Sequence, residues 1–339
     1  MKNLLITGGA GFIGVNVGHY FSDKNWAVTI FDNLSRRGSL NNLEWLRSRN
    51  QIRFEKGDVR DSEAVERLVK DIRPDAVLHL AAQVAVTTSV TNPREDFEIN
   101  ALGTLNLLEA VRNLVPSCSF IYASTNKVYG RMEDVAIGEK QNRYEYVELE
   151  SGVAEERSLD FHSPYGCSKG AADQYTIDYG RIYGLNSTVF RQSCIYGPRQ
   201  FGVEDQGWVA WFAIAAMLGK PITIYGDGKQ IRDVLDVSDL ARAYEAALDR
   251  AGDLKGEVFN MGGGPANTMS LLEVIALLES RLSIKIPFKF DAWRPGDQPV
   301  YVSNIQKADR LLGWKPRVDA STGIGKLVEW IRVNRGLFA

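Results

Sequence analysis

The chain has 339 residues, of which 45% are hydrophobic and 24% charged, and its formal net charge is -2. This composition is typical of a globular protein with a substantial core, and no basic run suggests nucleic acid as a partner. The three cysteines, Cys118, Cys167 and Cys194, are widely spaced and form no Cys-x-x-Cys pair. That spacing argues against a disulfide framework and a metal site, and it favours a cytoplasmic location.

Neither of the two notable apolar runs indicates a segment that inserts into a membrane. The N-terminal apolar run is too short for a signal peptide. The longest apolar run, residues 208–218, is too short to cross a bilayer and predicts a buried helix. We therefore expect no membrane association.

The first predicted elements surround a glycine turn. A short apolar run from Leu4 predicts a buried strand, and the periodic residues 12–21 predict the helix that follows. Between them, Gly8 allows a tight turn, Gly11 allows backbone amides to approach a pyrophosphate, and Gly14 allows close packing of helix and strand. The N-terminus of this helix would face the anion.

A carboxylate follows at the position that a dinucleotide fold requires. The second predicted strand, residues 26–31, ends at Asp32, where a carboxylate would bind the adenosine ribose hydroxyls. It would repel a 2′-phosphate, so the sequence favours NAD. Arg36 and Arg37 could bind such a phosphate, but we interpret them as part of a solvated loop.

Strands and helices then alternate, which predicts an α/β fold with a Rossmann-type doubly wound parallel sheet. The expected helices cover 40–48, 62–72 and 97–114, and the expected strands cover 52–55, 76–80 and 119–123. Ligands bind such sheets at the carboxyl ends of the strands. There, Asp58 is expected either to accept from the adenine amino group or to cap the next helix, and Ala81, Ala82 and Gln83 would let the cofactor lie against the backbone.

Two polar motifs predict proton transfer chemistry. The strand over 119–123 is followed by Thr125, and a helix from Ser163 to about Tyr183 carries Tyr165 and Lys169 on one face. A nearby ammonium would favour the phenolate and lower the pKa of Tyr165 from its usual value near 10. Tyr165 would then act as acid and base, Lys169 as its electrostatic partner, and Thr125 as the donor that orients the substrate.

These motifs resemble a known family. The turn Gly8-Gly9-Ala10-Gly11-Phe12-Ile13-Gly14, Thr125 and Tyr165-x-x-x-Lys169 resemble the extended short-chain dehydrogenases/reductases, and among them the nucleotide-sugar epimerases and dehydratases. More narrowly, residues 32–36, 124–130, 160–175 and 205–208 resemble the CDP-paratose 2-epimerases, also called CDP-tyvelose 2-epimerases. The resemblance extends over nearly the whole chain.

Departures from the dehydratase pattern narrow the implied activity. The 4,6-dehydratases of the family carry an Asp-Glu pair after the catalytic threonine, whereas this chain has Asn126 and Lys127. Water elimination would lack its acid and base. Cys194 likewise replaces an asparagine of the dehydratases.

The resemblance also implies two sets of binding residues. The NAD contacts would be Gly8, Gly11, Phe12, Ile13, Gly14, Asp32, Asn33, Ser35, Arg36, Asp58, Val59, Ala81, Ala82, Gln83, Asn100, Tyr165, Lys169 and Gln192. The substrate contacts would be Ser89, Asn126, Gln200, Gln206, Arg232 and Arg294. Arg232 and Arg294 would bind a diphosphate. From the residues alone, Arg232 could equally be a structural partner of Asp233 or Asp236.

The implied reaction is inversion at C2 of a CDP-hexose through a 2-keto sugar, with NAD tightly bound throughout. The substrate would be CDP-paratose, giving CDP-tyvelose, or CDP-glucose, giving CDP-mannose. A UDP- or GDP-hexose 4-epimerase and a non-catalytic NAD-binding regulator are the alternatives.

We expect residues 1–190 to form the NAD-binding domain, with 237–262 returning to it. Residues 191–339 would mainly form a smaller mixed α/β lobe for the nucleotide sugar, with helices over 271–282, 305–312 and 324–333. Residues 131–161 lack periodicity and would form a lid or sugar-pocket loop. The family resemblance implies a homodimer or homotetramer built on the helices 97–114 and 164–183.

Overall fold

The computed structural model describes residues 1–294 and 297–338, and it divides into two compact units. The first unit comprises residues 1–128, 163–191 and 241–259, and the second comprises 129–162, 192–240 and 260–339. Residues 129–162, which we expected in the first domain, therefore cluster with the second unit. Each unit is described by itself below.

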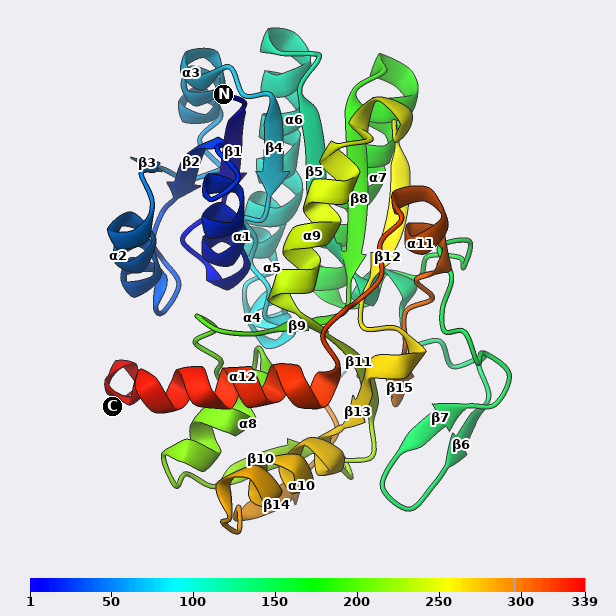
Figure 1. The fold of residues 1–339 in the computed structure, drawn as a ribbon. Coiled ribbons are helices and arrows are strands. Elements are labelled where there is room, and N and C mark those ends of the chain that lie inside the picture. Colours follow the sequence, from blue (N-terminus) through cyan, green and yellow to red (C-terminus); the bar gives the residue numbers. More distant parts are fainter. Residues whose placement is uncertain (295–296, 339) are drawn as a thin grey trace. The chain divides into compact units, whose positions relative to one another are not determined.

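The first unit contains a seven-stranded sheet in the order β3-β2-β1-β4-β5-β8-β12 (Figure 1). The strands are β1 Asn3–Thr7, β2 Ala27–Asp32, β3 Arg53–Lys56, β4 Ala76–His79, β5 Ser119–Thr125, β8 Asn186–Gln192 and β12 Glu257–Met261. The pairs from β3 to β5 are parallel. The strand order reverses beside β1, at the switch point where doubly wound sheets bind ligands. The expected Rossmann-type fold is confirmed.

Helices cover both faces of this sheet (Figure 1). They are α1 Phe12–Ser22, α2 Ser39–Arg49, α3 Ser62–Ile72, α6 Gly103–Leu114, α7 Ser163–Tyr183 and α9 Val237–Leu248. The short helices α4 Val86–Thr91 and α5 Pro93–Phe97 pack against α7. The apolar residues of α3, α6 and α7 form one buried cluster with β1, β4, β5 and β8. This packing fixes α7, which carries Tyr165, against the end of β5.

The helix expected over 97–114 differs from the prediction. It begins earlier, because Asn92 caps α5 and Pro93 occupies its first turn, and it passes through a π-helical turn, η1 Glu98–Leu102, before α6. Asn100 lies in this π-turn, and its side chain binds the backbone of Gln83. A π-turn inside a helix frequently marks a functional site.

The second unit packs three helices, α8 Trp208–Met217, α10 Leu271–Leu282 and α12 Ala320–Val333, around a buried apolar cluster. Its sheets are formed by β9 Cys194–Tyr196, β11 Ile231–Asp236, β13 Thr268–Ser270 and β15 Val300–Tyr301, and by β10 Ile222–Tyr225 with β14 Phe288–Asp291. The short helix α11 Gln306–Leu312 ends at Gly313 as predicted, with φ of 64°. Over residues 1–294 and 297–338, the structure has no helix with the length and apolarity needed to span a bilayer.

The segment 131–161 contains regular structure that its sequence did not reveal. Strands β6 Ile137–Glu139 and β7 Tyr144–Tyr146 form an antiparallel hairpin within the second unit. Arg143 donates two hydrogen bonds of 2.7 Å to Glu273, and the Tyr144 hydroxyl bonds Asp227 at 2.5 Å. Strands of three residues are too short to give a clear alternation, which is why the hairpin was missed. Its role as a lid stays a prediction.

Candidate active site

The glycine turn between β1 and α1 is shaped by close packing. Gly8 has φ of +67°, and a Cβ there would lie 2.6 Å from the Ala81 nitrogen. A Cβ on Gly14 would lie 2.4 Å from the Gly9 Cα. At Gly11 a Cβ would meet only the Gly8 oxygen, at 3.1 Å, within the described structure. The turn is thus tight against the sheet, and α1 begins at Phe12 with first-turn amides that have no acceptor within the helix.

Asp32 lies at the carboxyl end of β2, beside this turn. Its Oδ2 accepts from the Ala10 amide at 3.0 Å and its Oδ1 accepts from the Leu34 amide at 2.7 Å. The pKa of the carboxyl is raised, because the effect of burial outweighs that of these two amides, which lower it. Each carboxylate oxygen has a further lone pair that could accept from a ligand hydroxyl.

Asp58 is the next carboxylate along this edge. It accepts two hydrogen bonds from the Arg60 guanidinium and one from Asn33 Nδ2 at 3.0 Å, and the bonds from Arg60 contribute most to lowering its pKa to about 2. The alternative that Asp58 caps the following helix is wrong. Asp61 is the cap, because its side chain accepts from the Ala64 amide.

The remaining candidate cofactor residues surround these carboxylates. The Ser35 amide donates to Asn33 Oδ1, and Val59 is buried against Gly103. Beyond β4, the Gln83 amide donates to Asn100 Oδ1 at 2.9 Å. Ala81 and Ala82 lie between that strand and Gln83.

The three candidate catalytic residues come together in the first unit. The Thr125 hydroxyl at the end of β5 lies close enough to the Tyr165 phenol to act on its pKa, and it accepts from the Lys127 amide at 3.2 Å. Asn126 is buried, with its Oδ1 3.4 Å from the Thr125 Oγ1. Tyr165 itself is only 8% exposed. Its phenol therefore has one hydroxyl beside it and little access to water.

The expected lowering of the Tyr165 pKa by Lys169 is wrong for the protein chain alone. Burial dominates and raises the pKa of Tyr165 to about 12, while the nearby Thr125 hydroxyl opposes the rise. The Lys169 Nζ instead donates to the Ala123 oxygen at 2.5 Å and lies 4.3 Å from the centre of the Tyr122 ring. Burial also lowers the pKa of Lys169, to about 7.

A buried ion pair connects the elements that carry these residues. Asp173, one turn after Lys169 on α7, accepts two bonds of 3.0 Å from the Arg191 guanidinium on β8. Asp173 also accepts from the Ser124 hydroxyl at 2.7 Å, beside Thr125 on β5. Asp173 and Arg191 are 0% and 3% exposed. The pair therefore joins β5, α7 and β8 behind the candidate catalytic groups.

Five of the candidate ligand-binding residues belong to the second unit. They are Gln192, Gln200, Gln206, Arg232 and Arg294. Gln200 lies against Gly207, next to Gln206, and its Oε1 is buried without a partner in the described structure. Gln192, at the end of β8, is also buried.

The two arginines have different partners. Arg232 is buried and lies 3.8 Å from Asp297, so the alternative pairing with Asp233 or Asp236 is wrong. Those two carboxylates instead bind Ser193 and Ser238. Arg294 donates to Asp205 Oδ1 at 2.8 Å and covers the Tyr225 ring at 3.9 Å.

Two further positions have local partners. The Ser89 hydroxyl on α4 is buried and donates to the Val86 oxygen at 2.7 Å. Cys194, which replaces the asparagine of the dehydratases, accepts from the Trp208 indole nitrogen at 3.3 Å. Neither contact identifies a ligand.

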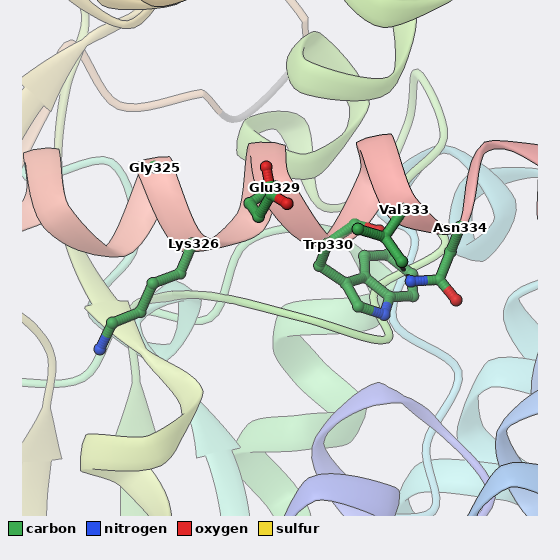
Figure 2. A pocket seen from close by; sticks show the side chains of 6 residues that line it. All are labelled: Gly325, Lys326, Glu329, Trp330, Val333 and Asn334. Carbon is green, nitrogen blue, oxygen red and sulfur yellow. Dashed lines mark hydrogen bonds between the residues drawn. The ribbon is translucent and has the colours of Figure 1, made fainter.

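A hollow of about 550 Å³ lies along α12. Figure 2 shows the side chains that line it. Its lining comes from Gly325, Lys326, Glu329, Trp330, Val333 and Asn334. None of these six residues is a candidate site residue, and all belong to α12 or to the residue that caps its C-terminus. We assign this hollow no role.

Comparison with known proteins identifies the family. Residues 5–327 match the family model described as GDP-mannose 4,6 dehydratase. The chain belongs to this family of extended short-chain dehydrogenases/reductases. It is 48% identical over 332 residues to the CDP-paratose 2-epimerase of Salmonella typhi, and the match covers 96% of this chain and 98% of that protein.

Solved structures of the same extended family share the fold. The UDP-glucose 4-epimerase of Thermotoga maritima, solved with UDP-glucose, has a TM-score of 0.83 and 32% identity, and the match covers 98% of this chain and 100% of the other. The UDP-glucose 4-epimerase of Thermus thermophilus, solved with NAD, has a TM-score of 0.82 and 32% identity, covering 98% and 99%. These matches span both units of this member of the family.

Sequence reasoning missed several buried polar residues of this family member. Asp173 had a visible signal, because it is a carboxylate on a helix that directly follows three small residues, one turn from Lys169. Asp96 had none, because its burial depends on contacts with Gln83, Asn100 and Ser168 that come from three separate elements.

Proposed function

We propose that this protein is an NAD-dependent nucleotide-sugar epimerase that inverts C2 of a CDP-linked hexose. The arrangement of Thr125, Tyr165 and Lys169 at the end of β5 carries the proposal, since it places a hydroxyl, a phenol and an amine in one buried site. The identity with a CDP-paratose 2-epimerase supports CDP-paratose as the substrate, with CDP-glucose as the second candidate.

The residues of the first unit fit NAD. The turn has no Cβ atoms at Gly8, Gly11 and Gly14, so its backbone amides could approach a pyrophosphate closely, and Asp32 offers a carboxylate to ribose hydroxyls. Asp58 and Gln83 would complete the site at neighbouring strand ends. When bound, NAD supplies the acceptor and donor of the hydride that C2 loses and regains.

The protein side chains would handle the proton. Tyr165 would take the proton of the C2 hydroxyl and return it to the same oxygen when the hydride comes back to the opposite face of C2. Thr125 would orient that hydroxyl, and the Lys169 charge would favour the phenolate. Asn126 and Lys127 supply no acid and base pair for loss of water. The proposed site therefore supports epimerisation rather than dehydration.

The deciding experiment uses the purified protein without added cofactor in deuterated water. With CDP-paratose or CDP-glucose, we expect inversion at C2 by proton NMR and no deuterium at C2, because the hydride returns internally. Deuterium at C2 would indicate proton abstraction instead and would contradict the proposed roles. Inversion of a UDP- or GDP-hexose at C4 in place of C2 would favour the 4-epimerase, and a lack of any turnover by NAD-loaded protein would favour a regulator.

We also propose a homodimer or homotetramer. Apolar side chains are exposed on the helices that the resemblance assigns to the interface, with Tyr175 53%, Ile182 66% and Phe97 55% exposed. Light scattering on the eluting protein would measure the mass, and a monomer would contradict this proposal. A cytoplasmic location stays a prediction from the cysteine pattern.

Arg294 gives a prediction for substrate binding. If its guanidinium binds the diphosphate, Arg294→Ala should raise KM for the CDP-sugar about 10- to 100-fold with little change in kcat, since charge-assisted bonds contribute about 1.5–3 kcal/mol. The matched control is Arg281→Ala, which removes an arginine of the second unit that binds Ser321. Equal KM values for the two variants would contradict the role of Arg294.

A further inference from the structure

The proposed mechanism leaves one buried carboxylate without a role. Asp96 on α5 is 0% exposed. It accepts hydrogen bonds from the Ser168 hydroxyl, from Gln83 Nε2 at 2.9 Å and from Asn100 Nδ2 at 3.2 Å. Burial raises the pKa of this carboxyl, whereas the three donors around it favour its ionised form, which only accepts. All three are neutral, so in the described structure no cation directly contacts this buried anion.

Asp96 therefore differs from the other buried carboxylate of this region. Asp173 has its counter-charge in contact, because Arg191 donates two bonds of 3.0 Å to it. A buried ion without such a partner is costly. The cation in electrostatic reach of Asp96 is Lys169, which directly follows the Asp96-bound Ser168 on α7.

We propose that Asp96 is a positioning residue, a buried counter-charge that keeps the Lys169 side chain in its ammonium form, with Ser168 holding the carboxylate in place. The catalytic consequence of Asp96 rests on the proposed function. The effect of Asp96 on the charge of Lys169 does not depend on which sugar is bound.

The other groups that face Lys169 determine in which direction the pKa of Lys169 changes when the Asp96 charge is lost. Burial lowers the pKa of His79 on β4 to about 3 and raises that of Tyr122 on β5, so both are neutral near pH 7. Tyr165 is neutral there too, since burial raises its pKa to about 12, and the Arg36 charge acts on this phenol. Burial lowers the pKa of Lys169 to about 7, and Asp173 and Asp96 oppose that fall.

Of these two anions, Asp173 has the larger effect on the pKa of Lys169 and is itself paired with Arg191, whereas the donors around Asp96 are neutral. Loss of the Asp96 charge should therefore lower the pKa of Lys169. The ammonium fraction at neutral pH would then fall.

The direct test follows the Lys169 titration itself. The full-length protein, carrying lysine labelled with carbon-13 at Cε, is titrated by NMR, and Lys169→Arg identifies the resonance. We expect Asp96→Asn to lower the pKa of Lys169 by about one unit, the effect of losing a nearby opposite charge. Asp96→Glu should restore it. An unchanged Lys169 titration in Asp96→Asn overturns the proposal, and Asp96→Ser repeats the test if Asp96→Asn does not fold.

The kinetic test separates this role from a structural one. In Asp96→Asn the alkaline limb of the kcat profile should move to lower pH, with kcat reduced about tenfold at pH 8 and about twofold at pH 6. Asp96→Glu should recover the wild-type limb. An equal loss at every pH would show a structural role and overturn the proposal. If the wild-type protein does not invert C2, the proposed function is wrong. The NMR titration would still test whether Asp96 raises the pKa of Lys169.

Discussion

We expect Tyr165→Phe to lower kcat for C2 inversion by about a thousandfold, the range that a positioned acid and base contributes. The phenol is buried beside the Thr125 hydroxyl, so bulk water has little access to replace it as proton acceptor. The ring stays in place, because phenylalanine keeps the same buried volume. Single-turnover NMR of C2 inversion would measure the loss, and the amount of NAD released on denaturation should equal that of wild type.

The matched control for this variant lies on the same helix. Tyr179 is also buried on α7, and its hydroxyl donates to Glu109 Oε1 at 2.6 Å. Tyr179→Phe makes the same chemical change away from Thr125 and should leave kcat within about twofold of wild type, because hydroxyl deletions outside a reacting site act mainly on stability. If both variants lose activity equally, the loss in Tyr165→Phe comes from a disturbance of α7 and not from the missing hydroxyl that transfers the proton. Full activity of Tyr165→Phe would remove the residue from the mechanism.

The local elements of the fold could be predicted from the sequence because their signals are local. Helix α3 spans Ser62–Ile72 as expected, since its apolar residues recur at helical spacing after a capping aspartate. The glycine turn was predictable for a similar reason, since Gly8 and Gly14 lie where a Cβ would collide with backbone. The spacing of Tyr165 and Lys169 gave the face of α7 that meets β5.

The electrostatics of the site could not be predicted, because they depend on tertiary burial. Helical spacing brings an ammonium near a phenol, but it does not show that Lys169 donates to the Ala123 oxygen or that desolvation dominates the pKa of Tyr165. The partner of Arg232 was missed for a related reason. The nearby Asp233 and Asp236 were the obvious choices, whereas the structure places Asp297 beside it. Long-range contacts of this kind leave no periodic pattern.

The buried pair of Asp173 and Arg191 gives the largest expected effect on stability. Asp173→Asn keeps the shape of the side chain but leaves the Arg191 charge buried and uncompensated, which should cost about 3–5 kcal/mol of unfolding free energy. Because Ser124 and Arg191 both bind Asp173, the ends of β5 and β8 would lose a shared anchor. Urea unfolding of the full-length protein, followed at one fixed NAD concentration for every variant, would measure this cost.

A double variant distinguishes the loss of the pair from the burial of a lone charge. Asp173→Asn combined with Arg191→Met removes both charges, and replacing a whole buried pair by uncharged residues is often close to neutral. We therefore expect the double variant to recover most of the stability lost in Asp173→Asn, while kcat stays low because β8 and α7 are no longer joined through Arg191. Recovery of both stability and kcat would show that the pair does not align Thr125 with Tyr165. A double variant as unstable as Asp173→Asn would contradict the electrostatic origin of the cost.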